Sequence, residues 1–291
     1  AQYYEMHYLA LYNSNIRDKG MTPYEAHAAA NNAMGKPDSE GGLGYMIFSV
    51  PSGENLIGTN GKLNPHATLG NRVAYNGKVF TIMPDNWLDE GFRKALRQEY
   101  NLSYNTKTDK SDTYASIGYL KDDGYMIKTD FERYSGRLNY NVYPVKWLKT
   151  GLNLGVTRTV SNYSSSTASS SSSYNNLTRY IRTMAPIYPV HKHDLQTGAY
   201  LDAKGKVTTN PSEYVYDYEG ARLSNTGRDA VAETVLNNRD FVRSNQTGHT
   251  YLTLTPIEGL NLTANYSINN VDYRGKVYEN PYVGDGTAGP G

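Results

Sequence analysis

Two histidines in the second half of the chain are the first candidates for metal chemistry. The segment His191-Lys-His193-Asp194 brings two imidazoles and a carboxylate close together, and both groups are common zinc ligands. Alternate residues of a strand point the same way, so both imidazoles could face one ion, but no third ligand follows nearby. The sequence therefore predicts a surface loop at this segment, with no metal and no other cofactor.

Acidic residues give a second candidate, because Asp85, Asp89 and Glu90 are spaced like a pair of acid–base carboxylates. They also open a short helical segment that begins near Trp87, and a helix dipole favours acids in its first turn. We expect these acids to stabilise the helix through its dipole and not to act in catalysis. The segment Asp122-Asp123-Gly124 is predicted to form a hairpin turn rather than a cation site. No nucleophile elbow, phosphate loop or His-Glu-x-x-His motif occurs in the sequence, so an enzyme is not predicted.

The composition of the 291 residues narrows the class of protein. Mean hydropathy is -0.65, and 28 residues are tyrosine, which has an apolar ring and a polar hydroxyl. Lys plus Arg (29) nearly equals Asp plus Glu (28), so nucleic-acid binding is not expected. Cysteine is absent, which excludes disulfides and thiolate sites. No apolar run approaches the roughly 20 residues of a transmembrane helix, whereas membrane β-strands need apolar groups on one face only.

From residue 98 onward the hydrophobic pattern has a period of two, which is typical of β-strands with one apolar face. Six such segments alternate apolar side chains with Asn, Ser, Thr, Gly or Tyr. The apolar sets are Tyr100, Leu102 and Tyr104; Ala115, Ile117 and Tyr119; Leu138, Tyr140 and Val142; Leu152, Leu154 and Val156; Leu252 and Leu254; and Leu260, Leu262, Ala264, Tyr266 and Ile268.

A short internal repeat in the sequence supports the prediction of two hairpins. Residues 140–148 and 252–260 both carry a proline between apolar positions, at Pro144 and Pro256, and both prolines are expected in short turns. The connections that alternate with these turns are longer, above all residues 161–243. Short turns on one side and long loops on the other are typical of outer-membrane barrels.

The first 97 residues differ from the rest. Thr22-Pro-Tyr-Glu25 is a capping box with proline at the first helical position, and Gly35 supplies a stop, which predicts a helix between them. An earlier helix is favoured by the spacing of residues 4–12. We therefore divide the chain into a connector at 1–97, with short helices and irregular segments, and the first part of a β-barrel at 98–291, which includes the long loop at 161–243.

Strands with one apolar face fit either a soluble sandwich or a barrel wall between lipid and water. The polar faces carry mainly uncharged groups, which suits a hydrated lumen. Three aromatic residues lie beside the predicted short turns, where they could anchor at lipid headgroups. These predicted membrane-interface residues are Tyr104, Tyr140 and Trp147.

Three blocks of the sequence carry a resemblance to a known family, at 85–104, 113–125 and 130–139, together with Tyr4-Glu5 and Leu63-Asn-Pro65 in the preceding connector. In these segments the sequence resembles the SusC/RagA class of TonB-dependent outer-membrane transporters. This resemblance covers residues 1 to about 160, weakens in the long loop and returns at the Pro256 hairpin. The resemblance implies an all-β chain that is part of a transmembrane antiparallel barrel of about 22 strands with a plugged lumen.

The same resemblance implies a function and partners. The barrel would import a glycan or a peptide across the outer membrane of a Bacteroidetes-like Gram-negative cell, under a SusD-class surface lipoprotein. TonB would engage a segment before residue 1, and further strands would follow residue 291. Loop tyrosines can stack on sugar or peptide surfaces. The candidates for substrate contact are Tyr163, Tyr174, Tyr180, Tyr188, Tyr200, Tyr214, Tyr216 and Tyr218.

Two other classes of protein stay open from the residues alone. A secreted carbohydrate-binding β-sandwich would show the same alternation, with Leu138, Leu154 and Ile268 packed against a second sheet. A surface enzyme on a smaller barrel would need a catalytic constellation at the loop end.

Overall fold

The computed structural model of the protein describes residues 1–75, 78–162, 176–217 and 228–284. The chain forms two compact units. Unit 1 comprises Ala1–Glu90, Asn176–Glu233 and Tyr282–Gly284, and unit 2 comprises Gly91–Asn175, Thr234–Pro281 and Asp285–Gly291. Part of the predicted long loop therefore folds together with the N-terminal segment rather than with the strands that it connects.

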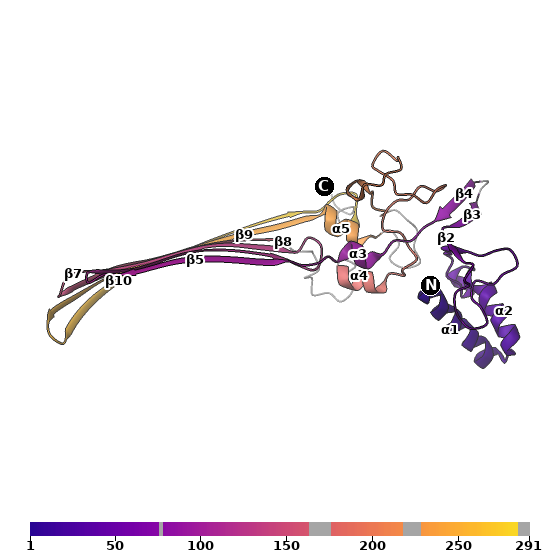
Figure 1. The fold of residues 1–291 in the computed structure, drawn as a ribbon, viewed down its shortest axis with the longest axis horizontal. Helices are drawn as coiled ribbons and strands as arrows, with labels where there is room; N and C mark the ends of the chain where they lie inside the picture. Colours follow the sequence, from indigo (N-terminus) through magenta and orange to yellow (C-terminus); the bar gives the residue numbers. More distant parts are fainter. Residues whose placement is uncertain (76–77, 163–175, 218–227, 285–291) are drawn as a thin grey trace. The chain divides into compact units, whose positions relative to one another are not determined.

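Unit 2 is a six-stranded antiparallel sheet in which each strand pairs with its neighbour in the sequence (Figure 1). The order across the sheet is β10-β9-β8-β7-β6-β5. All six segments with a period of two are strands, as predicted. The strands are β5 (Arg97–Lys107), β6 (Ser111–Asp123), β7 (Asp130–Val145), β8 (Leu148–Asn162), β9 (Asn238–Ile257) and β10 (Leu260–Tyr278).

The connections differ sharply between the two ends of the sheet. Residues 108–110, 146–147 and 258–259 form short turns at one end, and residues 124–129 and 163–237 link strands at the other. Arg97 pairs with Asp122, so β5 begins at the end with the long connections. The N-terminal segment thus enters the sheet at that end.

The two prolines of the internal repeat, Pro144 and Pro256, lie near the ends of β7 and β9 and not in the turns themselves. The β7–β8 ladder passes from Val142 to Val145 and skips Pro144, and the β9–β10 ladder shifts register beside Pro256. Because a bulge requires no ladder N–H at these positions, proline is tolerated there.

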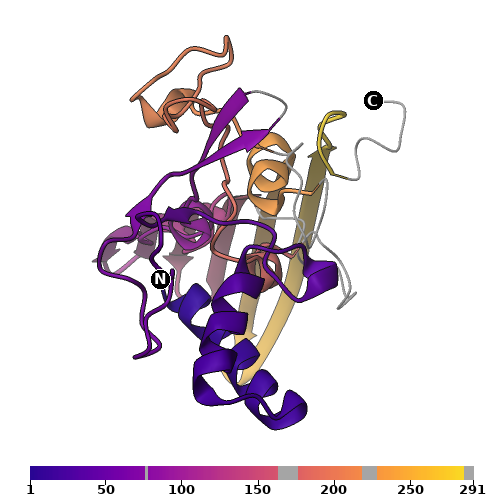
Figure 2. The same cartoon turned by 90° about the vertical axis from the view of Figure 1, so that its right-hand side faces the viewer.

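Unit 1 begins with two packed helices, α1 (Gln2–Lys19) and α2 (Pro23–Met34), drawn in indigo in Figure 2. The predicted capping box is present, since Thr22 Oγ1 accepts from the Glu25 N–H and the Glu25 carboxylate accepts from the Thr22 N–H. Gly20 ends α1 in the left-handed region, at φ 64°. None of the helices in the described ranges is long and apolar enough to cross a membrane.

The other elements of unit 1 are short. They are η1 (Asp38–Glu40), β1 (Phe48–Ser49), β2 (Thr68–Leu69), β3 (Asn71–Tyr75), β4 (Lys78–Ile82), α3 (Trp87–Gly91), α4 (Leu177–Thr183) and η3 (Pro211–Glu213), with α5 (Ala230–Leu236) beginning in unit 1 and ending in unit 2. The core of unit 1 contains residues from both the N-terminal segment and the long connection. The Trp87 ring packs 5.5 Å from the Tyr180 ring and donates Nε1–H to the Tyr188 carbonyl at 2.9 Å.

Replacing Gly151 with alanine tests the packing of the sheet. A Cβ at Gly151 would collide with the ring of Tyr251, whose hydroxyl donates to Asn141 Oδ1 at 2.7 Å. We expect Gly151→Ala to lower the free energy of unfolding by about 1–3 kcal/mol, the usual cost of overpacking. Gly136→Ala is the matched control, because its Cβ would meet only Val156 Cγ1, at 3.2 Å. Equal losses in urea-unfolding experiments would contradict this account.

Candidate functional site

The register of the sheet separates two chemically different faces. Tyr104, Ala115, Leu138, Leu154 and Ile268 occupy one face along a row that crosses the sheet. Their sequence neighbours on the opposite face are mostly Asn, Ser, Thr and Gly. The sheet is thus apolar on one face and polar and largely uncharged on the other.

The apolar face is open in this chain. Leu138, Leu154 and Ile268 are 36%, 43% and 57% exposed, whereas a sandwich would bury them. On β8 the apolar positions run from Leu148 to Val156, which spans about 26 Å along the strand. At a tilt of about 40° this gives about 20 Å of height, close to the apolar band of roughly 25 Å on membrane barrels.

The apolar band crosses the strands diagonally. On β5 and β6 the band covers Tyr100 to Tyr104 and Ala115 to Tyr119, so it extends from the row described above toward the long connections. On β10 it covers Leu260 to Ile268, near the short turns. A level band that crosses tilted strands must shift register from strand to strand, as it does in a closed barrel.

The aromatic residues predicted at the membrane interface are all exposed on this chain. Tyr104, Tyr140 and Trp147 are 61%, 42% and 54% exposed, and Tyr104 and Tyr140 lie on the apolar face. Their assignment to lipid headgroups stays a prediction.

Sequence reasoning missed a second aromatic row toward the long connections. The rings of Tyr100, Tyr119 and Tyr134 lie side by side on β5, β6 and β7, with centroids 6.4 and 5.1 Å apart. Direct pairing of Tyr100 with Tyr119 and of Tyr119 with Tyr134 makes the row. Aligning the three predicted strands as consecutive hairpins would have shown it.

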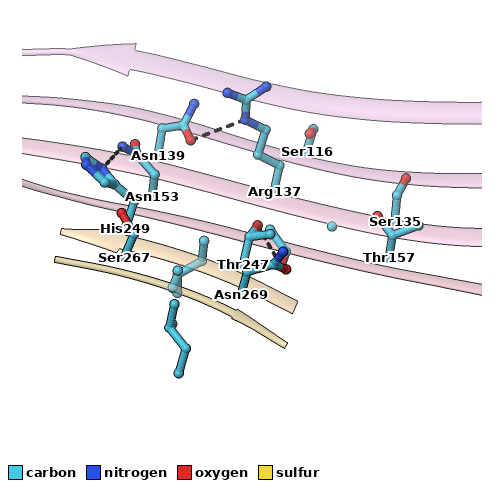
Figure 3. Close-up of a pocket in the computed structure, with 15 residues that line it drawn as sticks. Ser116, Ser135, Arg137, Asn139, Asn153, Thr157, Thr247, His249, Ser267 and Asn269 are labelled. Carbon is cyan, nitrogen blue, oxygen red and sulfur yellow. Dashed lines mark hydrogen bonds between the residues drawn. The ribbon is translucent and has the colours of Figure 1, made fainter. Parts of the chain in front are cut away.

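The polar face holds a hollow of about 750 Å³ (Figure 3). Arg137 Nε donates to Asn139 Oδ1 at 3.3 Å, and the Asn153 amide contacts His249 Nδ1 at 3.2 Å. Hydroxyls and amides supply the other labelled polar groups in the figure. This lining agrees with the hydrated lumen that the sequence predicts for this face.

The strongest polar cluster of unit 1 is centred on Asp85. Its carboxylate accepts the N–H groups of Val190 and His191 at 2.8 and 2.9 Å and the Tyr200 hydroxyl at 2.7 Å. His193 Nε2 lies 3.2 Å from Asp85 Oδ2, and the two side chains are 7% and 2% exposed. Asp85 thus holds residues 190–200 of the long connection against the N-terminal segment.

The electrostatics of this pair favour its charged form. Burial would raise the pKa of Asp85, but hydrogen bonds from His193, the His191 N–H and Tyr200 together lower it below its ordinary value. Burial would likewise lower the pKa of His193, but Asp85 outweighs burial and raises it. Burial and the Asp85 carboxylate raise the pKa of Tyr200.

A second pair lies beside the first. His191 Nε2 is 3.0 Å from Glu90 Oε2, and the His191 side chain is 5% exposed. Three tyrosine rings surround this imidazole. Tyr216, Tyr214 and Tyr200 have centroids 4.8, 5.5 and 5.9 Å from it.

The prediction of a surface loop at 191–194 is therefore wrong for the two histidines. Each imidazole is buried against a carboxylate from residues 85–90. Asp85 and Glu90 also do more than complement a helix dipole, because each is the partner of a histidine about a hundred positions later in the chain. Within the described ranges, no group of three His, Cys, Asp or Glu side chains could hold a metal ion.

The predicted substrate tyrosines fall into three groups. Tyr180 and Tyr188 are each 2% exposed and belong to the core of unit 1. Tyr200, Tyr214 and Tyr216 are half-buried around His191, and the rings of Tyr200 and Tyr214 stack at 4.0 Å. Tyr163, Tyr174 and Tyr218 lie outside the described residues. Contact of these tyrosines with a substrate stays a prediction.

The sheet has the architecture of a wall segment of an outer-membrane β-barrel, with one open apolar face, short turns at one end and long connections at the other. Among solved structures, the chain is similar in fold to the RagAB peptide transporter. The two are 21% identical with a TM-score of 0.51, and the match covers 95% of this chain and 27% of that one. The all-β fold class is confirmed, and so, at the level of the fold, is the resemblance to the SusC/RagA class.

Two other matches are structures of the RagAB peptide importer. In the closed-closed state the identity is 23% and the TM-score 0.47, over 72% of this chain and 22% of that one. In the open-open state the identity is 20% and the TM-score 0.49, over 88% of this chain and 24% of that one. This chain thus spans about a quarter of each solved transporter chain. No family model and no curated protein matches it.

The Asp85–His193 pair predicts a pH dependence. Because the pKa of His193 is raised, its contribution to stability is complete below the ordinary histidine pKa of about 6.5 and is lost as pH rises through the raised value. Because the pKa of Asp85 is lowered, its contribution is lost only when pH falls below the ordinary aspartate value. We expect opening of residues 190–191 to become easier by about 1.5 kcal/mol at high pH, the scale of a charged hydrogen bond.

Hydrogen exchange of the Val190 and His191 amides, corrected for intrinsic rates, measures this opening. In His193→Gln the dependence on pH should disappear. His66→Gln is the control, because the exposed His66–Glu54 pair is similar in length, at 3.0 Å. Exchange in the parent chain that shows no trend with pH would rule the account out.

Proposed function

We propose that this chain is part of the barrel of a TonB-dependent, SusC-like transporter that imports a nutrient, a glycan or a peptide, across the outer membrane. The main observation behind this proposal is the sheet, whose open face is apolar over about one membrane thickness. The fold similarity to a peptide transporter supports the proposal, as does the resemblance of residues 85–139 to the SusC/RagA class.

Edge strands support closure into a larger barrel. The six-stranded sheet ends at β5 and β10, whose outer edges pair with no strand of the described chain. In hydrocarbon every backbone N–H and C=O must be paired, so further strands are required on both sides. A SusD-class surface lipoprotein and TonB are the expected partners, by the resemblance alone.

The direction of the strands suggests which end of the sheet is extracellular. β5 begins, β8 ends and β9 begins at the end of the sheet with the long connections. Long barrel loops are extracellular and short turns periplasmic. These strand ends would then lie on the side of the membrane where the nutrient is met.

Extraction of the full chain from native membranes tests the barrel. We expect the protein to stay in the membrane in carbonate or high salt and to leave it only in detergent. Release without detergent, as a monodisperse monomer, would instead favour the secreted sandwich. Uptake of labelled peptides and glycans by cells with and without the gene would then identify the nutrient.

A matched pair of variants tests which face meets lipid. Leu152→Arg places a charge in the middle of the apolar band of β8 and should cost about 2–4 kcal/mol in membrane stability. Thr157→Arg, five residues away on the polar face, should be assembled at nearly the parent level. The readout is the heat-modifiable, folded fraction in outer membranes. The proposal fails if the polar-face variant is the more damaging one.

A further inference from the structure

The apolar face of β5–β8 contains a groove with a basic end. Two adjoining hollows of about 580 and 550 Å³ lie along this face. Their linings share Leu102, Ile117, Gly136 and Val156, so they form one continuous groove. The absent side chain of Gly136 leaves the floor open, because a Cβ there would lie 3.2 Å from Val156 Cγ1.

The groove ends beneath the second aromatic row. Tyr100, Tyr119, Tyr134 and Arg158 line its end toward the long connections. Arg158 pairs directly across from Tyr134 and is exposed. The groove thus passes from aliphatic walls to tyrosine rings and one guanidinium.

Arg158 differs from the other cations at this level of the same face. Lys121 lies 3.8 Å from Asp123, and Arg274 donates to Asp272 at 3.0 Å. Arg158 has no ion-pair partner among the described residues. The acid nearest in register, Glu132, accepts the Tyr134 hydroxyl at 3.0 Å. An anion that approaches along the groove would therefore find the guanidinium available.

We propose that this groove, defined by Leu102, Ile117, Gly136, Val156 and Arg158, binds one anionic phospholipid of the outer leaflet. The inference rests on the proposed function, since it needs the apolar face to meet a bilayer. An acyl chain fills the aliphatic part, and the phosphate lies on Arg158 among the tyrosines. Arginine matches phosphate with a planar fork of donors, and tyrosine suits the headgroup level. A zwitterionic phospholipid matches Arg158 less well, because its own cation already neutralises the phosphate.

Lipid retained by the full chain in mild detergent tests the site. The probes are dioleoyl phosphatidic acid and dioleoyl phosphatidylcholine, which share acyl chains and differ in headgroup, and bound lipid is counted by native mass spectrometry. We expect about fivefold more phosphatidic acid than phosphatidylcholine, the scale of one basic side chain acting on an anionic lipid. Arg158→Gln should abolish the preference.

Two further variants separate the groove from general surface charge. Arg137→Gln removes a cation from the opposite, polar face and should keep the fivefold preference. Gly136→Leu fills the floor and should reduce retention of both lipids. A parent chain without preference, or an Arg158→Gln variant that keeps it, overturns the lipid site while the need for detergent still supports the barrel. A protein that is monodisperse without detergent overturns both proposals.

Discussion

The strict alternation of the antiparallel register is the constraint on which unit 2 depends. A shift of one residue in any strand would turn its leucines toward the polar face and its asparagines toward the apolar one. The ladder from β5 to β10 keeps Leu138 beside Leu154 and Asn139 beside Asn153. Irregular pairing is confined to the bulges beside Pro144 and Pro256, next to the short turns, at one end of the apolar band.

Unit 1 depends on a different interaction, the burial of Asp85. A carboxylate that is 2% exposed would be costly without partners. Its partners come from Val190, His191, His193 and Tyr200, so satisfying one charge fixes the course of a segment about a hundred residues later. This arrangement explains why part of the long connection is well packed although it contains little regular secondary structure.

Much of unit 2 could be predicted from the sequence, because period-two alternation is a local signal. The six strands were found in this way, and the capping box at Thr22 in unit 1 was found from an equally local motif. The Asp85 cluster could not be found locally, since neither His193 nor Tyr200 shows its carboxylate partner in the neighbouring sequence. For the same reason Asp85 and Glu90 were assigned to a helix dipole. Tyr188 was grouped with the loop tyrosines that could contact a substrate, although its ring is buried against Tyr45.

The last two strands are longer than one membrane crossing requires. A spanning strand needs about 9 to 11 residues, whereas β9 has 20 and β10 has 19. The surplus lies beyond the apolar band and carries charges on both faces, with Asp240 opposite Lys276 and Arg243 opposite Tyr273. A ribbon that is charged on both faces is stable only where both faces are wet. Under the proposed function, this part of β9 and β10 would therefore extend beyond the bilayer.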